Sequence, residues 1–323
     1  MNENVVDVVV VGGGAAGLSA AVVLGRARRS VVVVDAGAPR NAPAAGVHGF
    51  LTRDGMSPAD LVETGRAEVA RYGGRVVSCV ATGARRVDDG FAVDLADGGV
   101  LLGRRLIVAT GLVDELPDVP GLADRWGRDV VHCPYCHGWE IRDQAIGVLG
   151  TGPMAVHSAL LFRQWSPDVV LFRHTAPELT DDQAEQLAAR GITVVEGGVA
   201  ALEVHDDKLT GVRLRSGEVV ARQALAVTSG LRAQADVLRA LGLETSPLEI
   251  AGHRVGDHAQ ADPTGATPIP GVWVAGNITD PLAQVVMAAG AGVKAAAAVN
   301  ADLIAEETAT AVAALRSREA VSR

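Results

Sequence analysis

Residues 5–17, VVDVVVVGGGAAG, decide the fold, because an apolar run typical of a buried strand meets a glycine turn and then small helix-forming residues. In the pattern Gly12-x-Gly14-x-x-Gly17, the first glycine makes the tight turn and the second lets the backbone approach a pyrophosphate. The third lets the helix pack closely on the strand. A pyrophosphate would lie at the helix N-terminus, where free amides attract anions. The stretch predicts a dinucleotide-binding βαβ unit.

The second strand of this unit is expected to end at Asp35, where a carboxylate can bind ribose hydroxyls. An acid at this place favours an unphosphorylated adenosine such as that of FAD, although the glycine pattern alone does not separate FAD from NAD. The later segment 271–277, GVWVAGN, favours FAD, because a long flavin needs contacts from a second region. We expect Gly276, Asn277 and a helix that starts around Gln284 to supply them.

The same design recurs at residues 145–174, where Gly150-x-Gly152-x-x-Ala155 again lies between a predicted strand and a predicted helix. The interval from Gly150 to Arg173 equals the interval from Gly12 to Asp35. The repeat predicts an α/β protein of two Rossmann-like three-layer nucleotide-binding domains, with the second inserted into the first. We assign residues 1–115 and 243–323 to an FAD-binding domain and residues 116–242 to an NAD(P)H-binding-like domain. A loosely tethered C-terminal helix is expected after residue 305.

The composition of this 323-residue chain argues against some classes of binding partner. Its net charge of -9 argues against nucleic acid, because a phosphate-binding surface needs an excess of Lys and Arg. Only 3% of the residues are aromatic, so no stacking surface is expected either. The N-terminal apolar run meets glycine too soon for a signal peptide or a transmembrane span. We therefore expect a cytoplasmic protein that binds neither membrane nor nucleic acid.

Two of the three cysteines form a close pair, in the segment His132-Cys133-Pro134-Tyr135-Cys136-His137. A C-x-x-C pair at the start of a helical turn has a lowered thiolate pKa, and one sulfur can attack while the other resolves. The flanking histidines, His132 and His137, are suited to proton transfer near neutral pH. Structural zinc is the competing interpretation, but it usually takes four ligands, so we expect no metal. The third cysteine, Cys79, is expected to be a buried thiol in the other domain.

These motifs, together with Ala109-Thr110-Gly111 and Ala275-Gly276-Asn277, resemble the low-molecular-weight thioredoxin reductase family in both order and spacing. The resemblance implies a homodimer in which Cys136 faces the flavin and Cys133 exchanges with substrate. One departure is Asn277, where the family usually has Asp. The residues that the resemblance and the motifs assign to FAD are Gly12, Gly14, Ala15, Ala16, Gly17, Asp35, Arg40, Asn41, His48, Thr110, Gly111, Gly276, Asn277, Gln284 and Val285.

A second departure narrows the expected activity. His137 stands where the family has an acidic Asp, and with His132 the motif resembles the gliotoxin and holomycin dithiol oxidases. The resemblance implies oxidation of a small dithiol through Cys133, Cys136 and FAD to oxygen. Two alternatives remain at this point, which are an NADPH-dependent reductase of a thioredoxin-like protein and a flavin-bearing redox sensor without turnover. Whether His132 or His137 is the acid/base is also open.

The second nucleotide motif keeps the glycine turn but changes the residues that follow the second strand. NADPH-using thioredoxin reductases carry a His-Arg-Arg run there, whereas this chain has Arg173-His174-Thr175. Because bidentate Arg contacts to phosphate are the strong ones, their loss weakens NADPH binding. We expect Gly150, Gly152 and Arg173 to form a vestigial or weak site, with genuine reduction by NADPH or NADH as the alternative.

Overall fold

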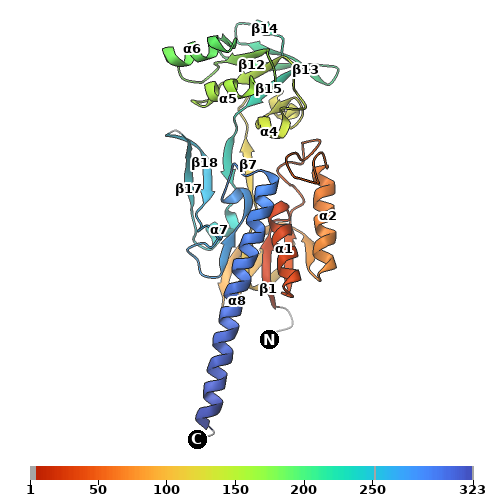
Figure 1. The fold of residues 1–323 in the computed structure, drawn as a ribbon, viewed down its shortest axis with the longest axis vertical. Coiled ribbons are helices and arrows are strands. Elements are labelled where there is room, and N and C mark those ends of the chain that lie inside the picture. Colours follow the sequence, from red (N-terminus) through yellow and green to blue (C-terminus); the bar gives the residue numbers. More distant parts are fainter. Residues whose placement is uncertain (1–4, 251, 322–323) are drawn as a thin grey trace.

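The computed structural model describes residues 5–250 and 252–321, and it contains two sheet-centred domains joined by a pair of strands (Figure 1). The expected βαβ unit forms the centre of the first domain, because its valine-rich strand is buried between two neighbours in parallel register. The strands of the first sheet, in spatial order, are β3 (Arg75–Ser78), β2 (Val31–Asp35), β1 (Val5–Val11), β6 (Val100–Val108), β5 (Gly90–Leu95) and β4 (Ala81–Val87), and β19 (Val272–Val274) also pairs with β6.

Both faces of the first sheet are covered. One face packs against helices, where the small side chains of α1 allow a long C-terminal helix to lie close to it. The other face packs against a short helix and a four-stranded sheet. The covering elements are α1 (Ala15–Arg26), α2 (Pro58–Arg71) and α8 (Val285–Val321) on the first face, and α7 (Asp236–Ala240), β17 (Thr245–Ile250), β18 (His253–Ala259), β16 (Gly230–Ala233) and β7 (Leu112–Glu115) on the other. The 3-10 turn η1 (Gly276–Ile278) precedes α8.

The second domain repeats the three-layer plan around a parallel sheet, as the repeated motif predicts. Helices cover one face, and a small antiparallel sheet covers the other. Its sheet strands in spatial order are β11 (Thr193–Val195), β10 (Val169–Phe172), β9 (Ile146–Leu149), β15 (Ala224–Val227) and β8 (Val130–Val131). Its other elements are α3 (Leu122–Arg125), α4 (Pro134–His137), α5 (Ala155–Phe162), α6 (Asp181–Ala189), β12 (Val199–His205), β13 (Lys208–Leu214) and β14 (Val219–Val220). The predicted fold class is confirmed.

The chain crosses between the domains on β7 and β16, which pair with each other in antiparallel register. Residues 230–242, assigned above to the second domain, pack into the first: Ala233, Val237 and Leu238 are buried in the same core as Val9. The apolar side chains of this segment have the valine face of the first sheet to bury against. We therefore place the second crossing at about residue 229 rather than at 242.

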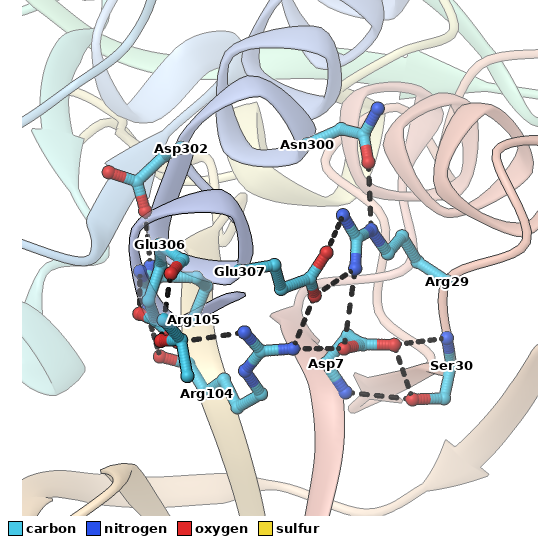
Figure 2. Close-up of polar contacts among 10 residues, drawn as sticks. Asp7, Arg29, Ser30, Arg104, Arg105, Asn300, Asp302, Glu306 and Glu307 are labelled. Atoms are coloured by element: carbon cyan, nitrogen blue, oxygen red, sulfur yellow. Dashed lines mark hydrogen bonds and ion pairs between the residues drawn. The ribbon is translucent and has the colours of Figure 1, made fainter. Parts of the chain in front are cut away.

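A cluster of charged groups ties α8 to the first sheet (Figure 2). Arg104 contacts Asp7 at 2.9 Å and Glu306 at 2.7 Å, and Arg105 contacts Asp302 at 2.5 Å. Arg29 adds an ion pair to Glu307 at 2.5 Å. The terminal helix expected after residue 305 is therefore the continuation of one helix, held as far as Glu307, and beyond that residue it projects from the body (Figure 1).

Two further expectations concern single features. Cys79 is only half-buried, beside the core on the sheet face opposite α1, so the expectation of a buried thiol is wrong in degree. It directly follows β3, an outer strand of the sheet, where the sheet edge leaves one side open. Over the described ranges, 5–250 and 252–321, we find no helix whose length and apolar character would let it cross a membrane.

Candidate functional site

A cavity of about 470 Å³ lies between the two domains, where the carboxyl ends of the first sheet face the segment that carries the cysteine pair. It brings together residues predicted from distant parts of the chain. Those that line it are Gly12, Gly14, Ala15, Ala16, Asp35, Arg40, Asn41, His48, Thr110, Gly111, His132, Cys133, Cys136, His137, Gly276, Asn277, Gln284 and Val285. Gly17 lies behind this surface, and the second glycine motif with Arg173 is not part of it.

The glycine turn at the start of α1 fits a diphosphate. Gly12 has φ of +105°, and a Cβ on Gly17 would lie 1.8 Å from the Gly12 carbonyl oxygen, so both positions need glycine for backbone reasons. A Cβ on Gly14 would meet no atom within 4 Å, which means that Gly14 faces the open cavity. The first turn of α1 has neither a side-chain cap nor an acidic residue. Its amides are therefore available to an anion.

Asp35 is held in place at the edge of the same cavity. Its Oδ1 accepts a hydrogen bond from the Gly13 amide at 3.1 Å, and its Oδ2 accepts one from Arg66 at 2.6 Å. Arg66 belongs to α2 and was not among the predicted residues, because nothing in its local sequence distinguishes it from an ordinary surface arginine. The pair fixes the Asp35 carboxylate, which suits a group that receives ribose hydroxyls.

Two other predicted residues have their side-chain donors engaged by the chain itself. The Thr110 hydroxyl donates to the Gln234 carbonyl at 2.6 Å, which joins the end of β6 to β16. The Asn277 amide donates to the carbonyls of Ala283 at 2.8 Å and Asp280 at 3.0 Å. An aspartate carboxylate cannot donate such bonds, so Asn at this position stabilises the turn before α8.

We therefore propose that FAD lies with its diphosphate at Gly14 and its adenosine ribose at Asp35. Gly14→Leu is expected to abolish flavin retention, because the side chain would enter the space that the diphosphate needs. The measurement is the ratio of flavin absorbance to protein absorbance after purification. Gly152→Leu is the matched control, because Gly152 holds the corresponding open position of the second motif and does not line this cavity. Full flavin content in the Gly14 variant would refute this placement.

The cysteine pair begins the short helix α4, with Cys133 as its N-cap residue in an extended conformation. The amides of Cys136 and His137 both donate to the Cys133 carbonyl, at 3.2 and 3.1 Å. A hydrogen bond from Cys136 lowers the pKa of the Cys133 thiol to about 7, against the opposing effect of burial. The same hydrogen bond, together with burial, raises the pKa of Cys136. One thiolate, stabilised by the neighbouring thiol, is therefore available near neutral pH.

The two histidines beside this pair differ in their surroundings. His132 stacks on Trp126, with ring centroids 5.4 Å apart, and burial lowers its pKa to about 4. Burial also lowers the pKa of His137, but the Glu140 carboxylate opposes that shift. Both rings are therefore neutral at pH 7. Each ring has a carboxylate that favours its charged form, Asp114 for His132 and Glu140 for His137, but the charge of Arg40 adds to burial in lowering the pKa of His132. We therefore expect His137 to be the better proton acceptor.

His48 connects the two domains at the rim of the cavity. Its Nε2 lies 3.4 Å from Glu140 of the second domain, and its Nδ1 lies 3.5 Å from Asp54 of its own loop. Glu140 was missed by the sequence analysis, because an acid four residues after a cysteine carries no motif. The sequence analysis also missed four residues that line the cavity, because none of them belongs to a motif. They are Asp114, Trp126, Ser229 and Gln234.

The second glycine motif keeps its shape, but its basic residues are engaged. Gly150 packs against the backbone of β10, where a Cβ would lie 2.8 Å from the Phe172 carbonyl, while Gly152 is open. Arg173 contacts Glu196 at 2.5 Å and also donates to the Ala176 carbonyl.

His174, the second basic residue of that run, is engaged as well. Its Nδ1 accepts a hydrogen bond from the Val199 amide at 2.9 Å, and burial with the charge of Arg215 lowers its pKa. At Arg173 and His174, a 2'-phosphate would therefore meet one already paired guanidinium and one neutral imidazole.

Two Rossmann-like domains with a glycine-turn cofactor cavity that opens on a dithiol define a disulfide oxidoreductase of the dinucleotide-binding class. The chain belongs to the pyridine nucleotide-disulphide oxidoreductase family, whose model matches residues 6–295. It is a flavin-dependent disulfide oxidoreductase of the thioredoxin reductase-like type, as the resemblance implied, and FAD is the cofactor that this family uses.

Named relatives cover most of the chain. Thioredoxin reductase sirT of Leptosphaeria maculans is 32% identical over 92% of this chain and 94% of its own. Thioredoxin reductase tcpT of Claviceps purpurea is 34% identical over 76% of this chain and 80% of its own. The crystal structure of HlmI has a TM-score of 0.90 at 51% identity, covering 97% of both chains.

Proposed function

We propose that this protein oxidises a small dithiol through the Cys133/Cys136 pair and FAD, with oxygen as the final acceptor. The observation that carries the proposal is the placement of both cysteines on the cavity that also holds the flavin-type glycine turn, while Arg173 of the second motif is already paired. In the proposed cycle the Cys133–Cys136 disulfide is the form that meets substrate. The reduced pair, with Cys133 as its lower-pKa thiol, is the form that is reoxidised.

The thiol–disulfide exchange transfers two electrons from the substrate dithiol to the cysteine pair. One substrate thiolate attacks Cys133, which breaks the Cys133–Cys136 bond and forms a mixed disulfide. The second substrate thiolate then displaces Cys133, so the substrate leaves as a disulfide and both cysteines are reduced. His137 takes up the proton that a substrate thiol must lose. A bound FAD would supply the acceptor for the two electrons that the reduced pair gives up as its disulfide re-forms, and oxygen that takes up these electrons with two protons would leave as hydrogen peroxide.

The alternative, in which NADPH reduces the flavin and Cys133 reduces a thioredoxin-like protein, is not favoured. It needs a cationic site for the 2'-phosphate, and Arg173 is already committed to Glu196 while His174 is neutral. The redox-sensor alternative leaves unexplained why both cysteines and both histidines should share one cavity with the cofactor site.

Anaerobic reduction of the flavin distinguishes these proposals. We expect a small dithiol such as dithiothreitol to bleach the flavin absorbance within the time of one catalytic turnover. An equal concentration of NADPH should leave the absorbance unchanged over that time. Arg173→Ala should alter dithiol oxidation less than about threefold, because a residue outside the reaction contributes nothing to its barrier. Rapid bleaching by NADPH that Arg173→Ala removes would support the reductase, and no bleaching by either reagent would support the sensor.

We also propose a homodimer formed through α8. Several large apolar side chains on this helix are exposed, among them Val293, Ile304 and Leu315, and their spacing places them along one side of it. A projecting helix with an apolar side is stabilised by packing against a partner helix. Light scattering should give a mass twice that of one chain, and Leu315→Asp should shift it toward one chain. A single-chain mass for the unaltered protein would contradict the proposal.

A further inference from the structure

Arg40 is the one lysine or arginine among the described residues that line the cavity, and its side chain is fixed. Its Nε and Nη2 donate to the two oxygens of Asp114, at 2.7 and 2.8 Å, and its Nη1 donates to the Pro281 carbonyl at 3.4 Å. The bidentate geometry holds the plane of the guanidinium as well as its position. Arg40 therefore brings a positive charge of defined location into a site where most lining groups are apolar.

Asp114 is itself held where the chain passes between the domains. Its side chain is only 7% exposed, and it accepts a third hydrogen bond from the Ser229 hydroxyl at 2.7 Å. Asp114 lies on β7, and Ser229 directly precedes β16, so both belong to the crossing strands. The bonds to Arg40, Ser229 and the paired strands make Asp114 a rigid anchor, which keeps Arg40 from turning out to solvent.

Arg40 lines the same cavity as the dithiol segment, residues 132–137. The pKa of Cys133 is lowered mainly by the hydrogen bond from Cys136, and the pKa of His132 is lowered mainly by burial. The positive charge of Arg40 lowers both pKa values further. It also opposes the rise in the pKa of Cys136 that the hydrogen bond to Cys133 causes.

The other titratable groups around the dithiol do not supply a comparable fixed charge. His132 and His137 are neutral at pH 7, and Glu140 and His48 lie together at the rim, where the acid and the ring contact each other. Asp114 is negative, so it limits the effect of Arg40 rather than adding to it.

We propose that Arg40 is the fixed positive charge that stabilises the thiolate of the Cys133/Cys136 pair, and that Asp114 is the positioning residue that holds Arg40 there and moderates its charge. This inference rests on the proposed function, because it assigns a role to the dithiol. It gives Arg40, which the sequence analysis assigns to the cofactor, a role toward the sulfurs. The pairing could not be predicted from the sequence, because Arg40 lies in a loop and Asp114 lies on a crossing strand far along the chain.

The proposal predicts that replacing Arg40 and replacing Asp114 have opposite effects on thiolate formation. Without Arg40 the thiolate loses its nearby cation, so the pKa of Cys133 rises. Asp114→Asn keeps a side-chain oxygen that can accept a hydrogen bond from Arg40, so the guanidinium stays in place. Its charge is no longer compensated, so the pKa of Cys133 falls. A purely structural role would instead move both variants in the same direction, because either change would disturb the same contact between Arg40 and Asp114.

The test is the rate of alkylation of the reduced, FAD-containing protein by iodoacetamide as a function of pH, under anaerobic conditions, with mass spectrometry to identify Cys133. At pH 6, Arg40→Met is expected to slow alkylation by roughly threefold to tenfold, since each pKa unit changes the thiolate fraction tenfold below the pKa. Asp114→Asn should speed it, and Arg40→Lys should stay closer to the unaltered protein than Arg40→Met does. Arg142→Met is the matched control, because Arg142 stacks on Trp139, three residues after Cys136, but does not line the cavity.

An unchanged pH profile in Arg40→Met, or slower alkylation in both Arg40→Met and Asp114→Asn, would overturn the proposal. Flavin content confirms that each variant is folded, and if Arg40→Met does not fold, Arg40→Lys and Asp114→Asn decide the sign. Alkylation needs neither oxygen nor a substrate dithiol. A protein that fails to oxidise dithiols but shows the expected alkylation shifts would therefore refute the proposed function while leaving this role of Arg40 in place.

Discussion

Cys133→Ser and Cys136→Ser are each expected to reduce dithiol oxidation by at least about a thousandfold, because either change removes one of the two sulfurs that must close the disulfide. The two variants should differ in spectrum. If Cys136 faces the flavin, Cys133→Ser keeps a thiolate next to the ring and should show a long-wavelength charge-transfer band, which Cys136→Ser should lack. Steady-state oxygen consumption and the absorbance spectrum measure the two effects.

Cys79→Ser is the matched control for the cysteine variants. Cys79 is a half-buried cysteine of the first domain that does not line the cavity, so its replacement should leave turnover and spectrum unchanged. The reverse spectral pattern, with the band in Cys136→Ser, would show that the two sulfurs have exchanged roles. Full turnover in either variant would exclude the dithiol from the reaction.

His137→Ala is expected to slow dithiol oxidation by on the order of a hundredfold, because the substrate thiols lose their proton acceptor. A base works in its neutral form, and the pKa of His137 is lowered from its usual 6.5 by burial. Activity should therefore persist below pH 6.5 and fall as the pH drops through the lowered pKa. In His137→Ala this acid limb should disappear, which a pH–rate profile with flavin content as the control would detect.

His132→Ala provides the comparison for His137→Ala. With a pKa of about 4 and a ring stacked on Trp126, His132 is a weaker acceptor and is expected to act mainly in packing. Its loss should cost less activity and leave the acid limb in place. An intact acid limb in His137→Ala with a lost limb in His132→Ala would reverse the assignment, and intact limbs in both would end the proton-carrier hypothesis.

The sequence by itself determined the fold class and the glycine-turn and dithiol parts of the cavity wall. Apolar strands, glycine turns and their spacing are local patterns, and each reports the conformation of the residues that carry it. Gly12, Asp35 and the repeated unit at Gly150 could therefore be placed from the order of the residues alone. The dithiol pattern is equally local, since Cys133 and Cys136 need only a helical turn to come together.

The tertiary structure decided the features that depend on contacts between distant segments, which local sequence patterns do not report. The end of the second domain depends on where residues 230–242 find an apolar face to bury against, and that face belongs to a distant sheet. The different surroundings of His132 and His137 follow from burial and from Glu140, although the two histidines looked equivalent in the sequence.

The pairings at the cavity and at the second glycine motif also depend on the fold: Arg40 with Asp114, Asp35 with Arg66, and Arg173 with Glu196 each join side chains from separate elements. The charge that a group carries and the partner that it meets are set by distance and solvent exclusion in the folded chain. Those quantities exist only once segments far apart in sequence have packed together.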